Sequence, residues 1–524
     1  MINLLEIAAP TFEWFQLAPL LIVFFGAAAG IVLEAVTPRS LRYPVQCFVA
    51  VLAVVVALAV TILNAIEFEG GRLVAMGVIA FDGPTLLFWS LLLLLSVGGI
   101  ALFAERGVGD GMSAFAASAA TVPGSPLERE AVTLKREHTE VFPLLLFSLF
   151  GMMVFASSND LITMFVSLEI FSLPLYLLSA MGRRRRLLSQ EAALKYFLLG
   201  SLASAFFVYG VALLYGFSGG FKLVDILTTI DAGTGSNVLL LTGLVMLAVG
   251  LLFKIGAVPF HTWVPDVYTG APTPVTGYMA VATKTAAMAA LLRVFFVALG
   301  GARWDWQPLL ATAAVLTMLV GATIGLLQTD IKRLLAYSSI VHAGFLLVAV
   351  TGAVAGEDRG ITSVSAIVFY LLTYGLSTLG AFGVVTMVRR AGGEANNIDA
   401  WRGLGKSNPF IAGIVTLFFL SLAGIPPTAG FIAKLGVFEA ASVGGYGWLV
   451  LVAVVCSIVA AFFYLKVVVA MWFGDPDPET AATIAVPSLW TWILVIVTAA
   501  ATLVLGILPG GVLDLLAGMS QFVH

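Results

Sequence analysis

The sequence has very little charge. Only 10% of its 524 residues are Asp, Glu, Lys or Arg, whereas soluble domains carry roughly a quarter. Hydrophobic residues make up 60% of the chain, and the mean hydropathy is +1.06. This composition excludes a soluble enzyme, a nucleic-acid-binding protein and a disordered chain, and the net charge of −3 favours no acidic or basic partner. We therefore expect an all-α polytopic membrane protein.

Cysteine and histidine are also scarce. The two cysteines, Cys47 and Cys456, both fall inside apolar runs, and the chain has four histidines. These numbers argue against a disulfide framework, a metal cluster and ordinary haem or iron–sulfur ligation. We expect no redox cofactor in this chain.

Long apolar runs dominate the sequence, and fourteen of them can cross a bilayer core of about 30 Å as helices. The predicted spans lie near residues 17–36, 44–66, 82–104, 140–157, 159–181, 192–217, 237–260, 273–300, 308–328, 333–353, 362–388, 408–437, 446–472 and 485–508. The long segment 105–139 is rich in small residues and then in charge, which predicts a mobile cytoplasmic excursion.

The positive charges between these spans are concentrated on one side. Sixteen Lys and Arg fall in the alternate loops that share a side with the first loop: Arg39, Arg42, Arg106, Arg129, Lys135, Arg136, Arg183 to Arg186, Lys332, Arg333, Arg389, Arg390, Arg402 and Lys406. The other side carries four: Arg72, Lys222, Arg303 and Arg359. Because cytoplasmic loops are enriched in Lys and Arg, we predict that both termini lie outside the cytoplasm.

Six basic residues remain inside the predicted spans, together with Glu169 and His342. The six are Lys195, Lys254, Lys284, Arg293, Lys434 and Lys466. At 1.5 Å per residue, Glu169 lies about 14 Å, Lys284 about 16 Å and His342 about 18 Å from the polar starts of their helices. Such depths are close to the bilayer centre, so these groups must face the protein interior or a hydrated cavity. Arg293 and Lys466 lie nearer helix ends, and we expect them to snorkel and to serve structure only.

A single buried charge often does no more than hold two helices together. Several titratable groups at similar depth on separate helices are costly, since helix packing in lipid needs only small residues and hydroxyls. A lysine taken out of water holds its proton less tightly, and an approaching carboxylate restores that hold. The whole set therefore favours proton transfer.

Two spans contain helix-breaking residues beside a lysine. Residues 254–274 contain four prolines, and residues 424–430 contain a Pro-Pro pair between glycines. Proline removes an intrahelical hydrogen bond, and irregular backbone at membrane depth is tolerated only around a cavity. Paired breaks in two halves of a chain indicate a transport site.

An internal repeat relates two blocks of five spans. GMMVFASSND (151–160) and GATIGLLQTD (321–330) have the same length, and each leads into a span with a central polar group. Because five is odd, successive copies must be inverted in the membrane. We expect two inverted five-helix repeats, each with a broken helix. The predicted regions are an N-terminal three-span part with its loop, the first repeat, the second repeat and a C-terminal span: 1–139, 140–300, 301–472 and 473–524.

Five segments are distinctive in their sequence and in their order. They are NDLITMFVSLEIFSLPLYLL (159–178), EAALKYFLLGSLASAFFVYG (191–210), FKIGAVPFHTWVPDVYTGAPTPV (253–275), DIKRLLAYSSIVHAGFLL (330–347) and LAGIPPTAGFIAKLGVF (422–438). Together they resemble bacterial NADH-quinone oxidoreductase subunit N, an antiporter-like membrane subunit of respiratory complex I equivalent to mitochondrial subunit 2. The resemblance covers nearly the whole chain.

The resemblance implies proton-transfer roles for Glu169, Lys254, Lys284, Lys434, Lys195, His261 and His342. Glu169 and Lys254 would form the charge pair of the first half. Lys284 would be the central relay and Lys434, where the sibling subunit M is expected to carry Glu, the lysine of the second half. The arginine run at 183–186 departs from the family pattern, and we expect it to alter contacts at the cytoplasmic face.

The resemblance also implies a setting. We expect a multi-pass protein of the bacterial plasma membrane whose partners are membrane lipids and other complex I membrane subunits, especially subunit M and the small ones. No nucleic acid is expected. NADH, FMN, iron–sulfur clusters and quinone are expected on other subunits, with no cofactor in this chain.

Our hypothesis from the sequence is a non-redox subunit of NADH:quinone oxidoreductase that moves protons, driven by quinone reduction elsewhere. A proton would enter from the cytoplasm near Lys195 and His261, load Lys254 and Lys284, and leave through Lys434. Two alternatives stay open: a stand-alone Mrp-type cation/proton antiporter, and a scaffold subunit that keeps the charges without transport.

Overall fold

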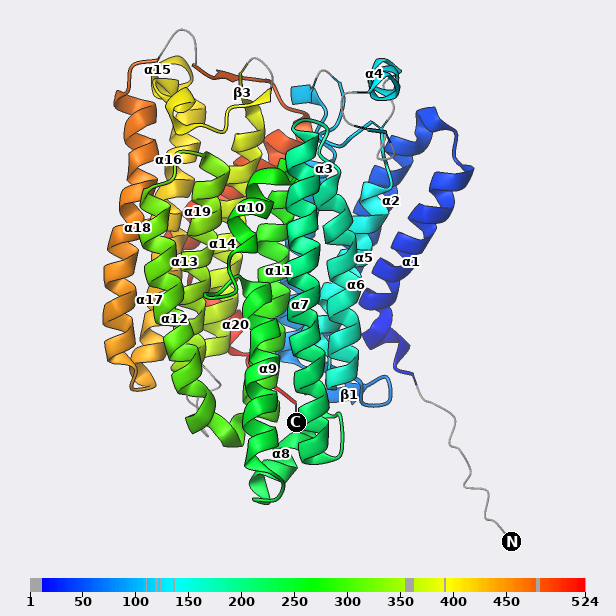
Figure 1. The fold of residues 1–524 in the computed structure, drawn as a ribbon, viewed down its shortest axis with the longest axis vertical. Helices are drawn as coiled ribbons and strands as arrows, with labels where there is room; N and C mark the ends of the chain where they lie inside the picture. Colours follow the sequence, from blue (N-terminus) through cyan, green and yellow to red (C-terminus); the bar gives the residue numbers. More distant parts are fainter. Residues whose placement is uncertain are drawn as a thin grey trace.

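The computed structural model is a bundle of helices aligned along one axis (Figure 1). It describes residues 12–109, 111–117, 121–122, 125–134, 137–353, 362–390, 393–476 and 481–523. Lys135, Arg136 and Arg359, which contribute to the predicted charge bias, lie outside the described residues.

Twelve helices are long and apolar enough to cross a membrane. They are α1 (Trp14–Val36), α2 (Arg39–Ile66), α3 (Gly83–Phe103), α6 (Leu161–Ala180), α7 (Arg186–Ser218), α9 (Asn237–Ile255), α11 (Thr273–Arg293, continued by a π-helical turn at Val294–Ala298), α12 (Arg303–Leu326), α13 (Ile331–Thr351), α14 (Thr362–Met387), α18 (Gly447–Phe473) and α19 (Leu489–Ile507). Two shorter apolar helices are α5 (Val141–Ser157) and α16 (Pro409–Ala423). Every predicted apolar stretch contains one of these helices, so the all-helical, multi-pass membrane fold is confirmed.

Short elements close the two ends of the bundle (Figure 1). One end has α8 (Leu223–Asp231) and the antiparallel pair β1 (Arg72–Val74) and β2 (Ile79–Phe81). The other end has α4 (Pro126–Thr133), α15 (Leu404–Ser407) and an antiparallel sheet in the order β4 (Gly393–Glu394), β3 (Val388–Arg390) and β5 (Thr483–Ile484). A last helix, α20 (Gly510–Ala517), packs against α14.

The described part of segment 105–139, which we predict to be a mobile cytoplasmic excursion, contains short helical elements and pairs with another part of the chain. It contains α4 and a single 3-10 turn at Gly107–Gly109. Two backbone hydrogen bonds join it to the end of α6, from Ala116 N to Met181 O at 2.8 Å and from Arg183 N to Ala114 O at 2.9 Å. A local sequence pattern does not predict this pairing, because Met181 and Arg183 are more than 60 residues further along the chain.

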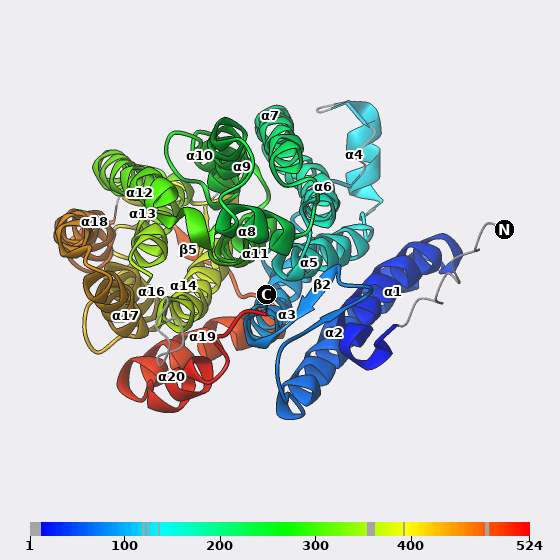
Figure 2. The same ribbon diagram turned by 90° about the horizontal axis from the view of Figure 1, so that it is seen from below.

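The central helices are α11, α13 and α14. Every residue of α13 is buried except Arg333, which is half-buried near its start. Viewed along the bundle, α11 and α14 lie inside, whereas α1 and α2 lie at one edge and α18 at the opposite edge (Figure 2). The sequence of α11 is rich in Ala and Thr, and such small residues let neighbouring helices approach closely.

The start of α6 is fixed to the loop that follows α7. The Asp160 side chain caps α6 by accepting the N–H of Thr163 at 2.7 Å. The same aspartate forms an isolated antiparallel bridge with Lys222, just before α8. This junction lies at the end of the bundle that carries β1 and α8 (Figure 1).

The start of α13 repeats this arrangement. The Asp330 side chain caps α13 by accepting the N–H of Arg333 at 3.0 Å, and Asp330 bridges Asn397 beyond α14. This second junction lies at the opposite end, beside β3 and β4 (Figure 1). The two matching motifs at 151–160 and 321–330 therefore lead into helices that begin at opposite ends.

The two predicted helix breaks share one local geometry. The first separates α9 from α10 (Trp263–Gly270), and the second separates α16 from α17 (Ala429–Val443). Each begins with a left-handed glycine, Gly256 at φ 77° and Gly424 at φ 81°, that caps the preceding helix through its N–H. In each, a proline joined by a cis bond follows three residues later, at Pro259 and Pro427. Lys254 precedes its break, whereas Lys434 follows its own.

Candidate functional site

Lys254 lies in the last turn of α9 with only 3% of its surface exposed. Its Nζ donates to Ser172 Oγ on α6 at 2.7 Å, and it lies 5.2 Å from the centre of the Phe171 ring. Both neighbours are uncharged. The buried lysine is therefore held by a hydroxyl and by aromatic faces.

Glu169, the predicted charge partner of Lys254, is one turn from Ser172 on the same helix but makes no direct ion pair with Lys254. No Lys254–Glu169 pair occurs within 4.0 Å, and Glu169 Oε1 is buried without a hydrogen-bond partner among the described residues. The amine reaches Ser172 instead, so the serine occupies the position that the carboxylate was expected to fill.

Lys284 lies at the centre of the bundle on α11, with 2% of its surface exposed. Its Nζ donates to the Oγ of Ser339 on α13 at 2.8 Å and also to the Ser339 carbonyl. The Tyr268 hydroxyl of α10 lies 3.3 Å from the same Oγ, and the Tyr374 ring lies below the amine at 5.1 Å. Three elements from both halves of the chain thus meet at one lysine.

His342 lies one turn further along α13 and is hydrogen-bonded through both ring nitrogens. Its Nδ1 is 2.5 Å from the Tyr370 hydroxyl of α14, and its Nε2 is 3.2 Å from the Tyr464 hydroxyl of α18. Tyr464 is in turn hydrogen-bonded to Ser338, the neighbour of Ser339. The partner of Lys284 and the end of the hydrogen-bond chain from His342 are therefore consecutive serines on α13.

Lys434 lies on α17, and the helix break provides one of its partners. Its Nζ donates to the carbonyl of Ala423 at 2.7 Å and to Ser457 Oγ on α18 at 2.9 Å. Ala423 is the last residue of α16, where carbonyls lack an intrahelical donor. The break therefore leaves an acceptor free for the buried amine.

A small cavity of about 10 Å³ lies between His342 and this second break. Its lining includes Ser377 of α14 and Ser421 of α16, which are hydrogen-bonded to each other at 3.0 Å. Gly430, at the start of α17, donates its N–H to Ser421 Oγ at 3.2 Å. The volume is close to the smallest that holds one water molecule, and the walls supply polar partners for it.

Lys195 and His261 differ from the buried groups. The Lys195 side chain is 44% exposed and forms ion pairs with Glu191 at 2.8 Å and Asp266 at 3.0 Å. Arg333 pairs with the other oxygen of Asp266 at 2.9 Å. His261 lies in the break between α9 and α10, half-buried, and its Nδ1 has no partner among the described residues.

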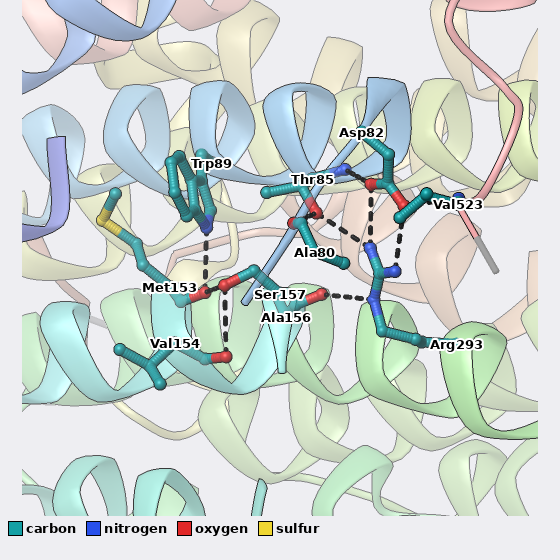
Figure 3. Close-up of polar contacts among 10 residues, drawn as sticks. All are labelled: Ala80, Asp82, Thr85, Trp89, Met153, Val154, Ala156, Ser157, Arg293 and Val523. Carbon is teal, nitrogen blue, oxygen red and sulfur yellow. Dashed lines mark hydrogen bonds and ion pairs between the residues drawn. The ribbon is translucent and has the colours of Figure 1, made fainter. Parts of the chain in front are cut away.

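Arg293 does not snorkel to the surface as predicted. It is fully buried at the end of α11, and its two terminal nitrogens each lie 2.9 Å from an oxygen of Asp82, the residue that caps α3 (Figure 3). Thr85 adds a third acceptor at 2.8 Å, and Val523 donates its N–H to Asp82 from the other side (Figure 3). Lys466, by contrast, is exposed on α18 as expected.

Several members of the site were not predicted from the sequence. Ser172 had a usable signal, since it lies three residues after Glu169 and three residues along a helix bring side chains to one face. Tyr268, Tyr370 and Tyr464 had none, because aromatic residues are common in apolar helices. No group of three or more metal-ligating side chains occurs among the described residues.

Comparisons with known proteins identify the family. The family model described as NADH:quinone oxidoreductase/Mrp antiporter, TM, matches residues 158–460. NADH-quinone oxidoreductase subunit N of a Nocardioides species is 52% identical over 533 residues, which cover 99% of this chain and 100% of that relative. The chain belongs to the NADH-quinone oxidoreductase subunit N family.

Solved structures agree with membership of the subunit N family. A chain of respiratory complex I from Thermus thermophilus with bound aureothin is 34% identical, with a TM-score of 0.75, over 96% of this chain and 100% of that chain. A chain of the Mrp complex from a Dietzia species has a TM-score of 0.78 over 96% of this chain and 97% of that one. Its identity is 21%, so that likeness concerns the fold alone.

Proposed function

We propose that this chain translocates protons as a membrane subunit of a bacterial NADH:quinone oxidoreductase, coupled to quinone reduction elsewhere in the complex. The observation that carries the proposal is the line of buried polar groups from Lys284 through His342 to Lys434. These groups lie on α11, α13 and α17, and their hydrogen-bond partners include serine and tyrosine hydroxyls, which can accept and donate a proton without an ion pair having to break. The chain itself would carry no redox centre.

The proposed path starts near Lys195 and His261, on the side that carries most of the loop arginines. From there the proton reaches Lys254 and then Lys284 at the centre. His342 would link Lys284 to the second break, through the tyrosine and serine hydroxyls on one side and the small cavity on the other. Lys434 would release the proton to the opposite side.

Glu169 would control the first lysine. With the amine on Ser172 and the carboxylate apart, Lys254 lacks the partner that favours its charged form, so this arrangement suits proton release. A charge change in a neighbouring subunit would bring the carboxylate towards Lys254 and reload it.

The proposal includes the arrangement in the membrane. Fourteen crossings in two inverted repeats, within the regions 1–139, 140–300, 301–472 and 473–524, would place both termini outside the cytoplasm. The matching helix starts at opposite ends of the bundle support the inversion. The partners would be other complex I membrane subunits, especially subunit M and the small ones.

The test is proton pumping coupled to NADH oxidation in assembled complexes that carry Lys254→Ala or Glu169→Ala. We expect pumping per NADH to fall in both variants, with the Lys254 variant more severely affected because it removes a carrier and not only its control. Lys466→Ala, which removes an exposed lysine outside the path, is the matched control. Wild-type pumping in both test variants contradicts the assignment.

A stand-alone cation/proton antiporter is the second candidate, because the fold is shared with the Mrp complex. Affinity purification separates the two: a complex I subunit co-purifies with the other subunits, and an antiporter does not. A scaffold role predicts instead that Lys284→Ala and Lys434→Ala alter assembly while pumping per assembled complex stays unchanged.

A further inference from the structure

Four arginines surround a groove at one end of the bundle, between α4 and the start of α7. The groove has a volume of about 740 Å³, and its lining includes Arg129 of α4, Arg183, Arg185 and Arg186 of the arginine run, and Leu187 and Leu188. We call it the arginine groove. Figure 2 shows α4 on the outside of the bundle, apart from the central helices and on the same side as α7.

The described lining of the arginine groove has more basic than acidic side chains. Glu128 is the one carboxylate among its described lining residues, against four arginines, and it is paired with Arg186 at 2.8 Å. The N-terminus of α7 also lies here, and the first turn of that 33-residue helix contains no acidic residue. Helix N-termini add partial positive charge, so the groove suits an anion.

An apolar stripe leads away from the arginine groove along α7. Leu187, Leu194, Leu198 and Leu202 follow the spacing of one helix face and are 56–70% exposed. Glu191 lies near this face, and its carboxylate is held by Lys195 at 2.8 Å. A ligand with a charged end and a long apolar part would match both features together.

We propose that the arginine groove binds the phosphate of an anionic glycerophospholipid whose acyl chain lies along the exposed leucines of α7. An arginine guanidinium can donate two parallel hydrogen bonds to two oxygens of one phosphate, so arginine binds a headgroup phosphate better than lysine does. If the arginines served only to orient the chain in the membrane, positive charge in the loop would be enough and no groove would be needed. A water-soluble anion would bind the arginines but would not contact the apolar stripe. Basic pockets at membrane-helix ends are known to hold acidic headgroups.

The experiment uses the protein in its assembled state, purified from its membranes and placed in phosphatidylcholine nanodiscs. A minor component is phosphatidylglycerol with a photoactivatable acyl chain, and cross-links are mapped by mass spectrometry. We expect labelling of α7 between Leu187 and Leu202. The double variant Arg129→Gln, Arg185→Gln should label about twenty-fivefold less strongly, since each arginine is worth about fivefold.

The matched control is Arg184→Gln. Arg184 belongs to the same run but lines a neighbouring cavity of about 350 Å³ and not the arginine groove, so this variant should label like the wild type. Arg129→Lys with Arg185→Lys keeps the charge and should label at an intermediate level, which preserves the test if the Gln variant fails to fold.

Four outcomes overturn the proposal. The first is undiminished labelling in the Gln double variant, or in the Lys double variant where the Gln variant does not fold. The second is equal labelling by photoactivatable phosphatidylcholine. The third is loss of labelling on adding inorganic phosphate, and the fourth is no labelling of α7 in the wild type. The third would assign the groove to free phosphate, and the fourth to a covering protein partner.

Discussion

At the scale of single residues, the buried cations fall into two kinds. Arg293 is matched by the carboxylate of Asp82, so its charge is permanently balanced. In the described part of the chain, the amines of Lys254, Lys284 and Lys434 donate hydrogen bonds to hydroxyl and carbonyl oxygens and form no ion pair within 4.0 Å. A guanidinium does not lose its proton, whereas an amine in neutral surroundings is able to, so the pairing separates a structural cation from the lysines that we propose as proton carriers.

This distinction predicts a large effect of Arg293→Met or Asp82→Leu on stability. Either change leaves one buried charge without its partner, which should destabilise the protein by about 3–5 kcal/mol. The double variant removes both charges and should recover much of that loss. Thermal unfolding of the purified protein measures it, and a double variant as unstable as the worse single variant would contradict this account.

The sequence predicted burial better than it predicted partners. Depth along an apolar helix correctly placed Lys254, Lys284 and His342 in the interior. It was wrong about Arg293, because the residue that balances it, Asp82, is 211 positions away in the sequence. The ion pairs of Lys195 with Glu191 and Asp266 were not predicted, because they depend on which face of α7 packs inward.

At the scale of elements, the breaks after α9 and α16 begin with the same left-handed glycine turn, but different side chains pack against the two glycines. Glycine and proline positions in the sequence were enough to predict both interruptions. The contact between Gly424 and the Lys434 side chain was not predictable, because it depends on how α17 packs back against the end of α16. A Cβ added at Gly424 would lie 2.6 Å from Lys434 Cδ, whereas one at Gly256 would meet Val264 at 2.8 Å.

The element-scale prediction compares Gly424→Ala with Gly256→Ala. Both place a side chain in a left-handed conformation at a cost of about 1–2 kcal/mol, so both should lower thermal stability by similar amounts. Only Gly424→Ala pushes the lysine from its acceptor on Ala423 and should lower pumping per NADH. Equal pumping in the two variants, measured in vesicles, would show that the position of the Lys434 amine is unimportant.

At the scale of the whole molecule, the helix junctions at Asp160–Lys222 and Asp330–Asn397 place equivalent turns at opposite ends. Counting apolar runs and loop charges predicted that the two equivalent turns lie at opposite ends of the bundle, since both counts need the sequence alone. Which helices lie side by side was not predicted, because the apolar faces of membrane helices are similar and could pack against many different helices. What remains to be measured is which end faces the cytoplasm.

Cysteine labelling of intact cells provides that measurement. Cys47 and Cys456 are first replaced, and a single cysteine is introduced at Lys222 or at Lys406, two exposed positions at opposite ends of the bundle. Because the Lys406 end carries most of the loop arginines, it should be cytoplasmic. A membrane-impermeant maleimide should therefore label Lys222→Cys in intact cells and Lys406→Cys only after permeabilisation. The reverse pattern would invert the proposed direction of proton uptake, and labelling of both from outside would contradict the crossing pattern itself.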